Sequence, residues 1–228
     1  MLIDDYVADL GDSLRGPRGP KHDLVVEARD SLVDAAESFE AEGLDRAEAE
    51  RLAVLEFGSV AEIAPAYQEE LAAVAGRRLG ILLFISVPTT ALLWSLIWQV
   101  FPVDVNDWAH KPDWFVPAAR ALDILQFATG VFGAVGLLLL RRRVRGPRLV
   151  TRSLGVLVWA SLPLGLGLCL ALQFGSRGPA GFDGYPPGVL LSVASLVVWL
   201  LQLYCATRCI RVSGPRSVAA PARSLSRS

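Results

Sequence analysis

Four long stretches of this chain carry no charged side chain: residues 79–103, 124–140, 153–176 and 184–207. As a helix rising about 1.5 Å per residue, the first stretch is long enough to cross the roughly 30 Å hydrocarbon core of a bilayer. Arginines and aromatic residues flank each stretch, which disfavours the alternative of four helices buried in a globular protein. We therefore predict an all-α protein, in which a small helical module precedes a four-helix transmembrane bundle with spans near residues 79–101, 121–140, 153–173 and 188–207.

The arginines near the predicted spans gather on one side of the membrane. Two precede the first span, six lie between the second and third, and five follow the fourth. The other side holds only Lys111, Arg120 and Arg177, beside four aspartates. By the positive-inside rule, we expect both termini to be cytoplasmic in a multi-pass protein of the cell membrane.

The segment ahead of the first span shows short amphipathic stripes. Apolar residues recur every three or four positions over residues 4–14 and again over residues 21–39, which predicts two helices. A Gly- and Pro-rich run at residues 15–20 separates them. Gly43 is expected to follow the end of the second helix, and Phe39 and Phe57 are the expected core anchors.

Two capping boxes predict where the next helices begin. Asp45 with Glu48 opens a third helix, and Ser59 with Glu62 opens a fourth that leads to the membrane. Pro65 would break one backbone hydrogen bond of this fourth helix. As an alternative, the first turn forms a separate 3₁₀ element and the α-helix begins at Pro65.

The change from an acidic to a basic part of the chain falls close to the start of the first apolar stretch. Residues 1–70 hold 18 acidic and 6 basic side chains, a net charge of −12, whereas the remainder is basic. So acidic a segment is not expected to bind nucleic acid or anionic lipid directly. The predicted domains are an acidic cytoplasmic module at 1–76, a transmembrane domain at 77–210 and a basic, disordered tail at 211–228. The excess of arginine over lysine, 20 to 2, is typical of a bacterial genome rich in G and C.

The sequence offers no recognisable catalytic, cofactor-binding or metal-binding motif, and we expect a protein without enzymatic activity. His22 and His110 fall on opposite sides of the membrane in the predicted topology, so they cannot share one site. Cys205 and Cys209 lie one helical turn apart, which is compatible with a metal or redox pair. No histidine or further cysteine completes a ligand set, so we interpret them, with Cys169, as packing or lipid-facing residues.

Small residues and prolines mark the predicted spans. A stripe of four candidate helix-packing residues on the second span suits close approach of helices, either within the chain or in a homodimer: Gly130, Gly133, Ala134 and Gly136. The third span carries Gly155, Gly165 and Gly167, and Pro88 and Pro163 are expected to kink the first and third spans. Asp123 stands three residues after Arg120 at the outer end of the second span, where we expect the two to pair rather than serve in transport.

Residues 6–71 resemble a known helical module, permease prefix domain 1, also called the HAAS signalling domain. The likeness rests on ordered segments: LRGPR after a short helix, EARDSLVDA on the long helix, EGLDRAEAERLAVLEFGS across the next turn and helix, and EIAPAYQEEL before the membrane. The resemblance implies a cytoplasmic module ahead of a variable membrane part, often encoded beside a PadR-type winged-helix regulator or within transporter operons. It implies no catalytic residues.

The resulting hypothesis is a signalling protein whose acidic module docks a PadR-like regulator, with Glu37, Glu40 and Glu48 as candidate docking residues. A module of net charge −12 suits the basic, DNA-facing side of a winged-helix protein, so the regulator would bind either the module or DNA. The alternatives are a small permease or accessory subunit of a transporter, and a purely structural membrane protein.

Overall fold

The structure is a computed structural model that describes residues 2–100, 112–142, 146–175 and 186–214. Its described residues form seven α-helices and no strand, which confirms the all-α prediction. The predictions for His110, Lys111, Arg177 and the tail beyond residue 214 lie outside the described residues. The helices are α1 (Leu2–Ser13), α2 (Arg18–Ala41), α3 (Arg46–Phe57), α4 (Val60–Val100), α5 (Phe115–Arg141), α6 (Pro147–Gly175) and α7 (Pro186–Ser213).

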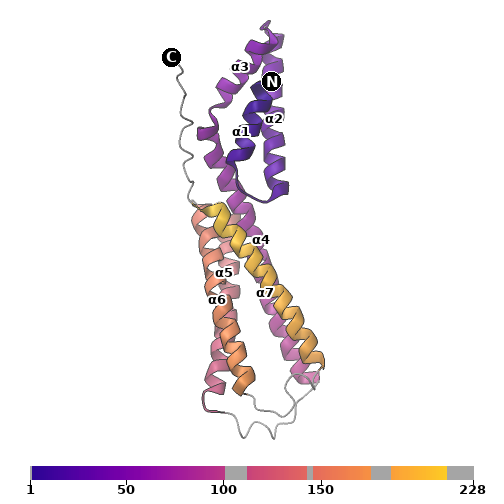
Figure 1. The fold of residues 1–228 in the computed structure, drawn as a ribbon, viewed down its shortest axis with the longest axis vertical. Coiled ribbons are helices and arrows are strands. Elements are labelled where there is room, and N and C mark those ends of the chain that lie inside the picture. The colour runs from indigo at the N-terminus through magenta and orange to yellow at the C-terminus, as the bar shows by residue number, and fades with distance from the viewer. Residues whose placement is uncertain (1, 101–111, 143–145, 176–185, 215–228) are drawn as a thin grey trace, which may run out of the picture.

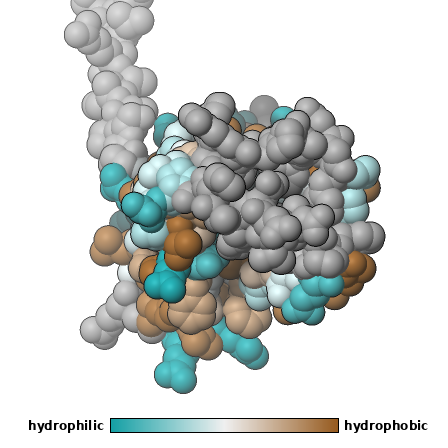
Figure 2. All heavy atoms as spheres, turned by 90° about the horizontal axis from the view of Figure 1, so that it is seen from below, coloured by the Kyte–Doolittle hydropathy of each residue, from teal (hydrophilic) through white to brown (hydrophobic). Residues whose placement is uncertain are grey.

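Four of these helices, α4 to α7, are long and apolar enough to cross a membrane, so the chain is a multi-pass membrane protein. Figure 1 shows them as a bundle, with α1, α2 and α3 gathered beside the protruding N-terminal half of α4. We call α1 to α3 with residues 60–72 of α4 the module, and the opposite end of the bundle the distal end. Seen from the distal end, apolar residues reach the outer surface on several sides of the bundle (Figure 2), where Leu92, Phe127 and Leu190 are more than two-thirds exposed.

The helix ends follow the capping predictions. The Asp45 side chain accepts a hydrogen bond from the Glu48 backbone N–H at 3.3 Å, and the Glu62 carboxylate accepts one from the Ser59 backbone N–H at 2.9 Å. Gly43 adopts the left-handed conformation with φ of 100°, as a residue after a helix end commonly does. The predicted helix starts and the role of Gly43 are thus confirmed, and each capping pair forms one of the two hydrogen bonds of a full capping box.

A single helix, α4, runs from the module through the bundle. Its 41 residues would measure about 62 Å, twice the thickness of the hydrocarbon core. The alternative of a separate element before Pro65 is therefore wrong, because the helix begins at Val60 and continues through Pro65. The carbonyl that Pro65 leaves without its helical donor belongs to Ala61, which is exposed and open to water.

The core of the module consists of leucines and alanines. Leu10, Leu32 and Leu71 are fully buried, together with alanines from α2, α3 and α4, and Val212 at the end of α7 belongs to the same cluster. Phe39 and Phe57 are partly buried and pack against this cluster, so they belong to the core as predicted but are not its fully buried centre. The alanines let the helices approach closely, and this leaves the two rings at the edge of the core.

Glycines set the close contacts of the bundle. α4 packs against α5, α6 and α7, whereas α5 and α7 make no contact with each other within the described residues. A Cβ added at Gly133 would lie 2.8 Å from Leu83 of α4, and one added at Gly155 would lie 2.9 Å from the Ala206 carbonyl of α7. Since both distances are shorter than ordinary contacts, neither position has room for a side chain unless its neighbour shifts.

Candidate functional site

One face of α2 carries a straight row of carboxylates, which we call the acidic row: Asp23, Glu27, Asp30, Asp34 and Glu37. The spacing of four, three, four and three residues keeps them on one face of the helix over about 21 Å. All five are exposed, whereas Ala28, Leu32 and Ala36, on the opposite face, are buried in the core of the module. The core therefore fixes α2 with its acidic row outward.

The acidic row has no cationic partner among the described residues. The ion pairs of the module and its junction join Arg29 to Asp4, Arg46 to Glu50, Arg51 to Glu48 and Arg148 to Glu69. None of these pairs includes a residue of the row. A shallow hollow along the same face is lined by His22, Val26 and Ser31 together with the first four acids of the row. The row is thus an exposed anionic strip with some apolar surface beside it.

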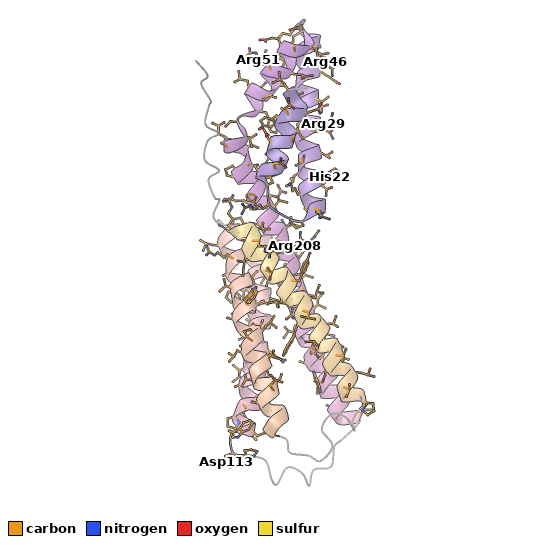
Figure 3. The ribbon with its side chains drawn as sticks, viewed as in Figure 1. His22, Arg29, Arg46, Arg51, Asp113 and Arg208 are labelled. Atoms are coloured by element: carbon orange, nitrogen blue, oxygen red, sulfur yellow. The ribbon has the colours of Figure 1, made fainter. Side chains whose placement is uncertain are left out.

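The three docking residues proposed from the sequence lie in different surroundings. Glu37 belongs to the acidic row, and Glu40 is exposed on α2 about a quarter turn away from it. Glu48 lies on α3, where its carboxylate receives two hydrogen bonds from Arg51, the shorter at 2.6 Å. These hydrogen bonds lower the pKa of Glu48. Figure 3 shows Arg46 and Arg51 at the tip of the module, away from the bundle.

The sequence analysis missed the other four members of the row. Their signal was present, since acidic residues recur at the helical spacing of Asp23, Glu27, Asp30 and Asp34. The prediction for this helix was based on its apolar stripe, which marks the face toward the core, and not on its charged face.

A belt of arginines surrounds the end of the bundle nearest the module. It comprises residues from all four membrane helices: Arg77, Arg78, Arg141, Arg148, Arg152, Arg208 and Arg211. Figure 3 places Arg208 at this junction and Asp113 at the distal end. Arg208 lies over the ring of Tyr204, with the guanidinium carbon 5.6 Å from the ring centre. The belt separates the acidic module from the apolar part of the bundle.

Two side chains near the start of α6, at the level of the belt, donate hydrogen bonds to the backbone of α4. Arg148 donates a hydrogen bond to the Pro65 carbonyl at 2.7 Å, and Thr151 donates one to the Ala72 carbonyl at 2.9 Å. Thr151 is fully buried. The module is therefore held against α6 as well as being continuous with α4.

A small cavity whose wall mixes six polar with seven apolar residues lies among the four membrane helices, and we call it the polar cavity. Its volume is about 50 Å³, and every helix of the bundle contributes to its wall. The polar side chains of the wall are Ser86, Thr90, Gln126, Thr129, Ser161 and Gln202. Gln202 of α7, which is 5% exposed, donates a hydrogen bond to the Ser86 hydroxyl of α4 at 2.8 Å.

The structure also places the small-residue stripe of the second span. A Cβ added at Gly130, Gly133 or Gly136 would contact, in turn, Val87, Leu83 or Leu154 of this same chain. Ala134, between them, is half-buried. The three glycines thus line contacts with α4 and α6.

The remaining candidates form no assembled site in the described part of the chain. Asp123 and Arg120 are both exposed, and no ion pair joins them there. Cys209 packs in the core of the bundle against Gly155, and the three cysteines are free thiols. Within the described residues, no three His, Cys, Asp or Glu side chains are grouped closely enough to hold a metal ion.

Comparison with protein-family models, curated proteins and solved structures finds no match to this chain.

Proposed function

We propose that this protein is a regulatory membrane protein whose module docks a basic cytoplasmic protein through the acidic row. The observation that carries the proposal is the exposed row of five carboxylates on α2, which has no ion pair within the described residues. Such a strip attracts a basic surface and speeds its association. The shared helix α4 and the bonds from α6 hold this strip at a fixed place beside the membrane.

The proposed orientation places the module and both termini in the cytoplasm. The arginine belt lies at the module end of the bundle, whereas Asp113 and Asp123 lie toward the distal end. Basic residues are retained on the cytoplasmic side of membrane proteins, which supports this assignment.

A PadR-like winged-helix regulator is the proposed partner. Two arguments support it: residues 6–71 resemble the permease prefix or HAAS module, and the DNA-facing side of a winged-helix protein is basic. A regulator bound to the acidic row would have its DNA-binding surface covered. The membrane protein would then act by sequestering or releasing the regulator.

The test uses the full-length protein in nanodiscs of neutral lipid and a PadR-type regulator encoded in the same operon. The double variant Asp30→Lys with Glu37→Lys is expected to slow association, and rising salt is expected to weaken binding of the unaltered protein, since exposed charges are screened over about 10 Å at 0.1 M. The matched control is Asp12→Lys with Glu56→Lys, which makes the same charge change at exposed sites on α1 and α3. Circular dichroism checks that both double variants stay helical.

A slower association confined to the row variant supports docking at this face. Equal slowing by both double variants would show that only the overall charge matters, and the acidic row would lose its role. If the regulator is not retained at any salt concentration, the docking proposal fails.

A transporter component, either a small permease or an accessory subunit, is the second candidate. The observation that favours it is the polar cavity among the four membrane helices. Transport would become the better proposal if deletion of the module abolished solute uptake or export in cells.

A further inference from the structure

The polar cavity in the bundle has a distinctive chemistry, because its six polar side chains are all neutral. They are hydroxyls and carboxamides, and none of the residues of its wall carries a charge. Ser86, Thr129, Ser161 and Gln202 are each at least nine-tenths buried. Each of the four already makes one hydrogen bond within the protein, as a polar group in an apolar medium must, and each has further hydrogen-bonding capacity.

The wall of the cavity offers both acceptors and donors, because the hydrogen bonds among the described residues use only some of its polar groups and leave the Thr90 hydroxyl and the Gln126 carboxamide unused. Thr129 donates its hydroxyl proton to the Leu125 carbonyl at 2.7 Å, and Ser161 donates to the Val158 carbonyl at 3.3 Å. Their oxygen lone pairs remain available, as does the second amide proton and the carbonyl oxygen of Gln202. A molecule in this cavity would be held best if it carried both an N–H or O–H donor and an acceptor oxygen.

The size of the cavity limits that molecule. A volume of about 50 Å³ exceeds the 10–15 Å³ that one water needs, so several waters or one solute of a few heavy atoms fits. An ion would lose its hydration without meeting an opposite charge, which is unfavourable at this depth. Neutral molecules avoid that cost.

On the side of the cavity nearer the module, the bundle is packed with apolar side chains. Leu83 and Leu154 are fully buried and fill the space beside Gly133 and Gly136, and Val158 is 1% exposed. We call these three the apolar layer. On the other side of the cavity, the pair α4 and α7 diverges from the pair α5 and α6 toward the distal end (Figure 1).

We infer that this cavity is a binding site for a small uncharged molecule that both donates and accepts hydrogen bonds, of the size and chemistry of urea or a simple amide. Gln202 and Ser86 of the α4 and α7 pair face Thr129 and Ser161 of the α5 and α6 pair across it. The site does not depend on the docking function proposed above, because it involves no residue of the module.

Thiol labelling tests the site in a full-length chain whose Cys169, Cys205 and Cys209 are replaced by alanine. In that background Ser161→Cys places a thiol in the cavity wall, and Val158→Cys places one in the apolar layer one turn away. We expect 2-hydroxyethyl methanethiosulfonate to modify Ser161→Cys about tenfold faster or more, because a thiol in apolar surroundings has a raised pKa and little access. Acetamide is expected to slow this modification, whereas methylammonium at the same concentration is not.

Two glycines of α6 provide matched variants that fill the cavity or leave it unchanged. A Cβ at Gly165 has room, with its nearest neighbours Leu125, Leu122 and Trp199 at 3.8–3.9 Å, while nothing lies within 4 Å of one at Gly167. Gly165→Val is therefore expected to fill the cavity and remove the rapid labelling of Ser161→Cys. Gly167→Val makes the same change outside the cavity and should preserve it.

Three results would overturn the inference. They are equal labelling of Ser161→Cys and Val158→Cys, no protection by acetamide, and equally fast labelling by the 2-aminoethyl reagent, whose size is similar but whose charge is positive. If Ser161→Cys does not fold, as judged by its thermal midpoint, Thr129→Cys on the facing helix replaces it with the same expected outcomes.

Discussion

Gln68 of α4 donates a hydrogen bond to the backbone carbonyl of Val212 of α7 at 3.1 Å, across 144 residues of sequence. The same carboxamide accepts a hydrogen bond from the Arg15 N–H at 2.9 Å and donates one to the Arg15 carbonyl at 2.7 Å. One buried side chain thus ties the turn between α1 and α2 to the end of the last membrane helix. Val212 also contributes its side chain to the core of the module, so the module is completed by the membrane domain.

Replacing Gln68 with leucine should therefore loosen the module from the bundle. The change leaves the buried Val212 carbonyl and the Arg15 backbone without partners, and we expect the free energy of unfolding to fall by about 1–3 kcal/mol. Amide hydrogen exchange of residues 14–16 and 210–213 should accelerate. Glu70→Leu, two residues along and exposed, serves as the control, and an equal loss there would contradict this role for Gln68.

The core of the module depends more on leucine than on phenylalanine. Leu32 is fully buried, whereas Phe39 is only half-buried. Leu32→Ala should lower the free energy of unfolding of the module by about 2–5 kcal/mol, because it leaves a cavity at the centre. Phe39→Ala should cost less, and thermal unfolding of the two variants compares them. A larger loss for Phe39→Ala would show that the edge of the core carries the stability.

The crossing of α6 and α7 has no space for a methyl group at Gly155. Gly155→Ala would push against the Ala206 carbonyl, and overpacking of this kind typically costs about 1–3 kcal/mol. Gly167→Ala on the same helix meets nothing within 4 Å and should be neutral or slightly stabilising. Chemical unfolding in detergent measures both, and equal stabilities would contradict the close crossing.

Acid should weaken the start of α4. Hydrogen bonds from the Ser59 hydroxyl and backbone N–H lower the pKa of the Glu62 carboxyl below its usual 4.5. A carboxyl with a lowered pKa stabilises the fold above its unfolded-state pKa, and this contribution disappears as the pH falls through the folded-state value. Glu62→Gln keeps a capping side chain but cannot titrate.

We therefore expect Glu62→Gln to lose less stability than the unaltered protein between about pH 5 and pH 3, as followed by the helical circular dichroism signal. Glu56→Gln removes an exposed carboxylate outside the cap and serves as the control. The assignment is wrong if Glu56→Gln alters the acid response as much as Glu62→Gln does.

The membrane helices could be predicted from sequence because a run of about 17 or more residues without a charge has few other stable uses. Their ends could not. The second span was expected from residue 121 and the fourth to residue 207, yet α5 begins at Phe115 and α7 ends at Ser213. Arg120, Arg208 and Arg211 continue these helices past the apolar run, since a helix is maintained by backbone hydrogen bonds and tolerates charge outside the hydrocarbon core.

The candidate sites differ in how far sequence could reveal them. The acidic row follows from the spacing of five residues on one helix, so the local pattern would have been sufficient to predict it, although the sequence analysis identified only Glu37. The cavity draws its polar side chains from four helices. Contacts between helices, such as that of Leu83 with Gly133, decide which face of each helix turns inward. These contacts join residues far apart in the chain, so a local sequence pattern does not predict them.

Because α4 is one unbroken helix, it fixes the rotational orientation of the module about the membrane normal. Each residue added to a helix turns everything beyond it by about 100° and raises it by about 1.5 Å. The number of residues between Leu71, in the core of the module, and Leu79, in the core of the bundle, therefore sets the direction in which α2 faces. Every copy of the protein would therefore present the carboxylates of the acidic row at the same height above the lipid and in the same direction relative to its own bundle.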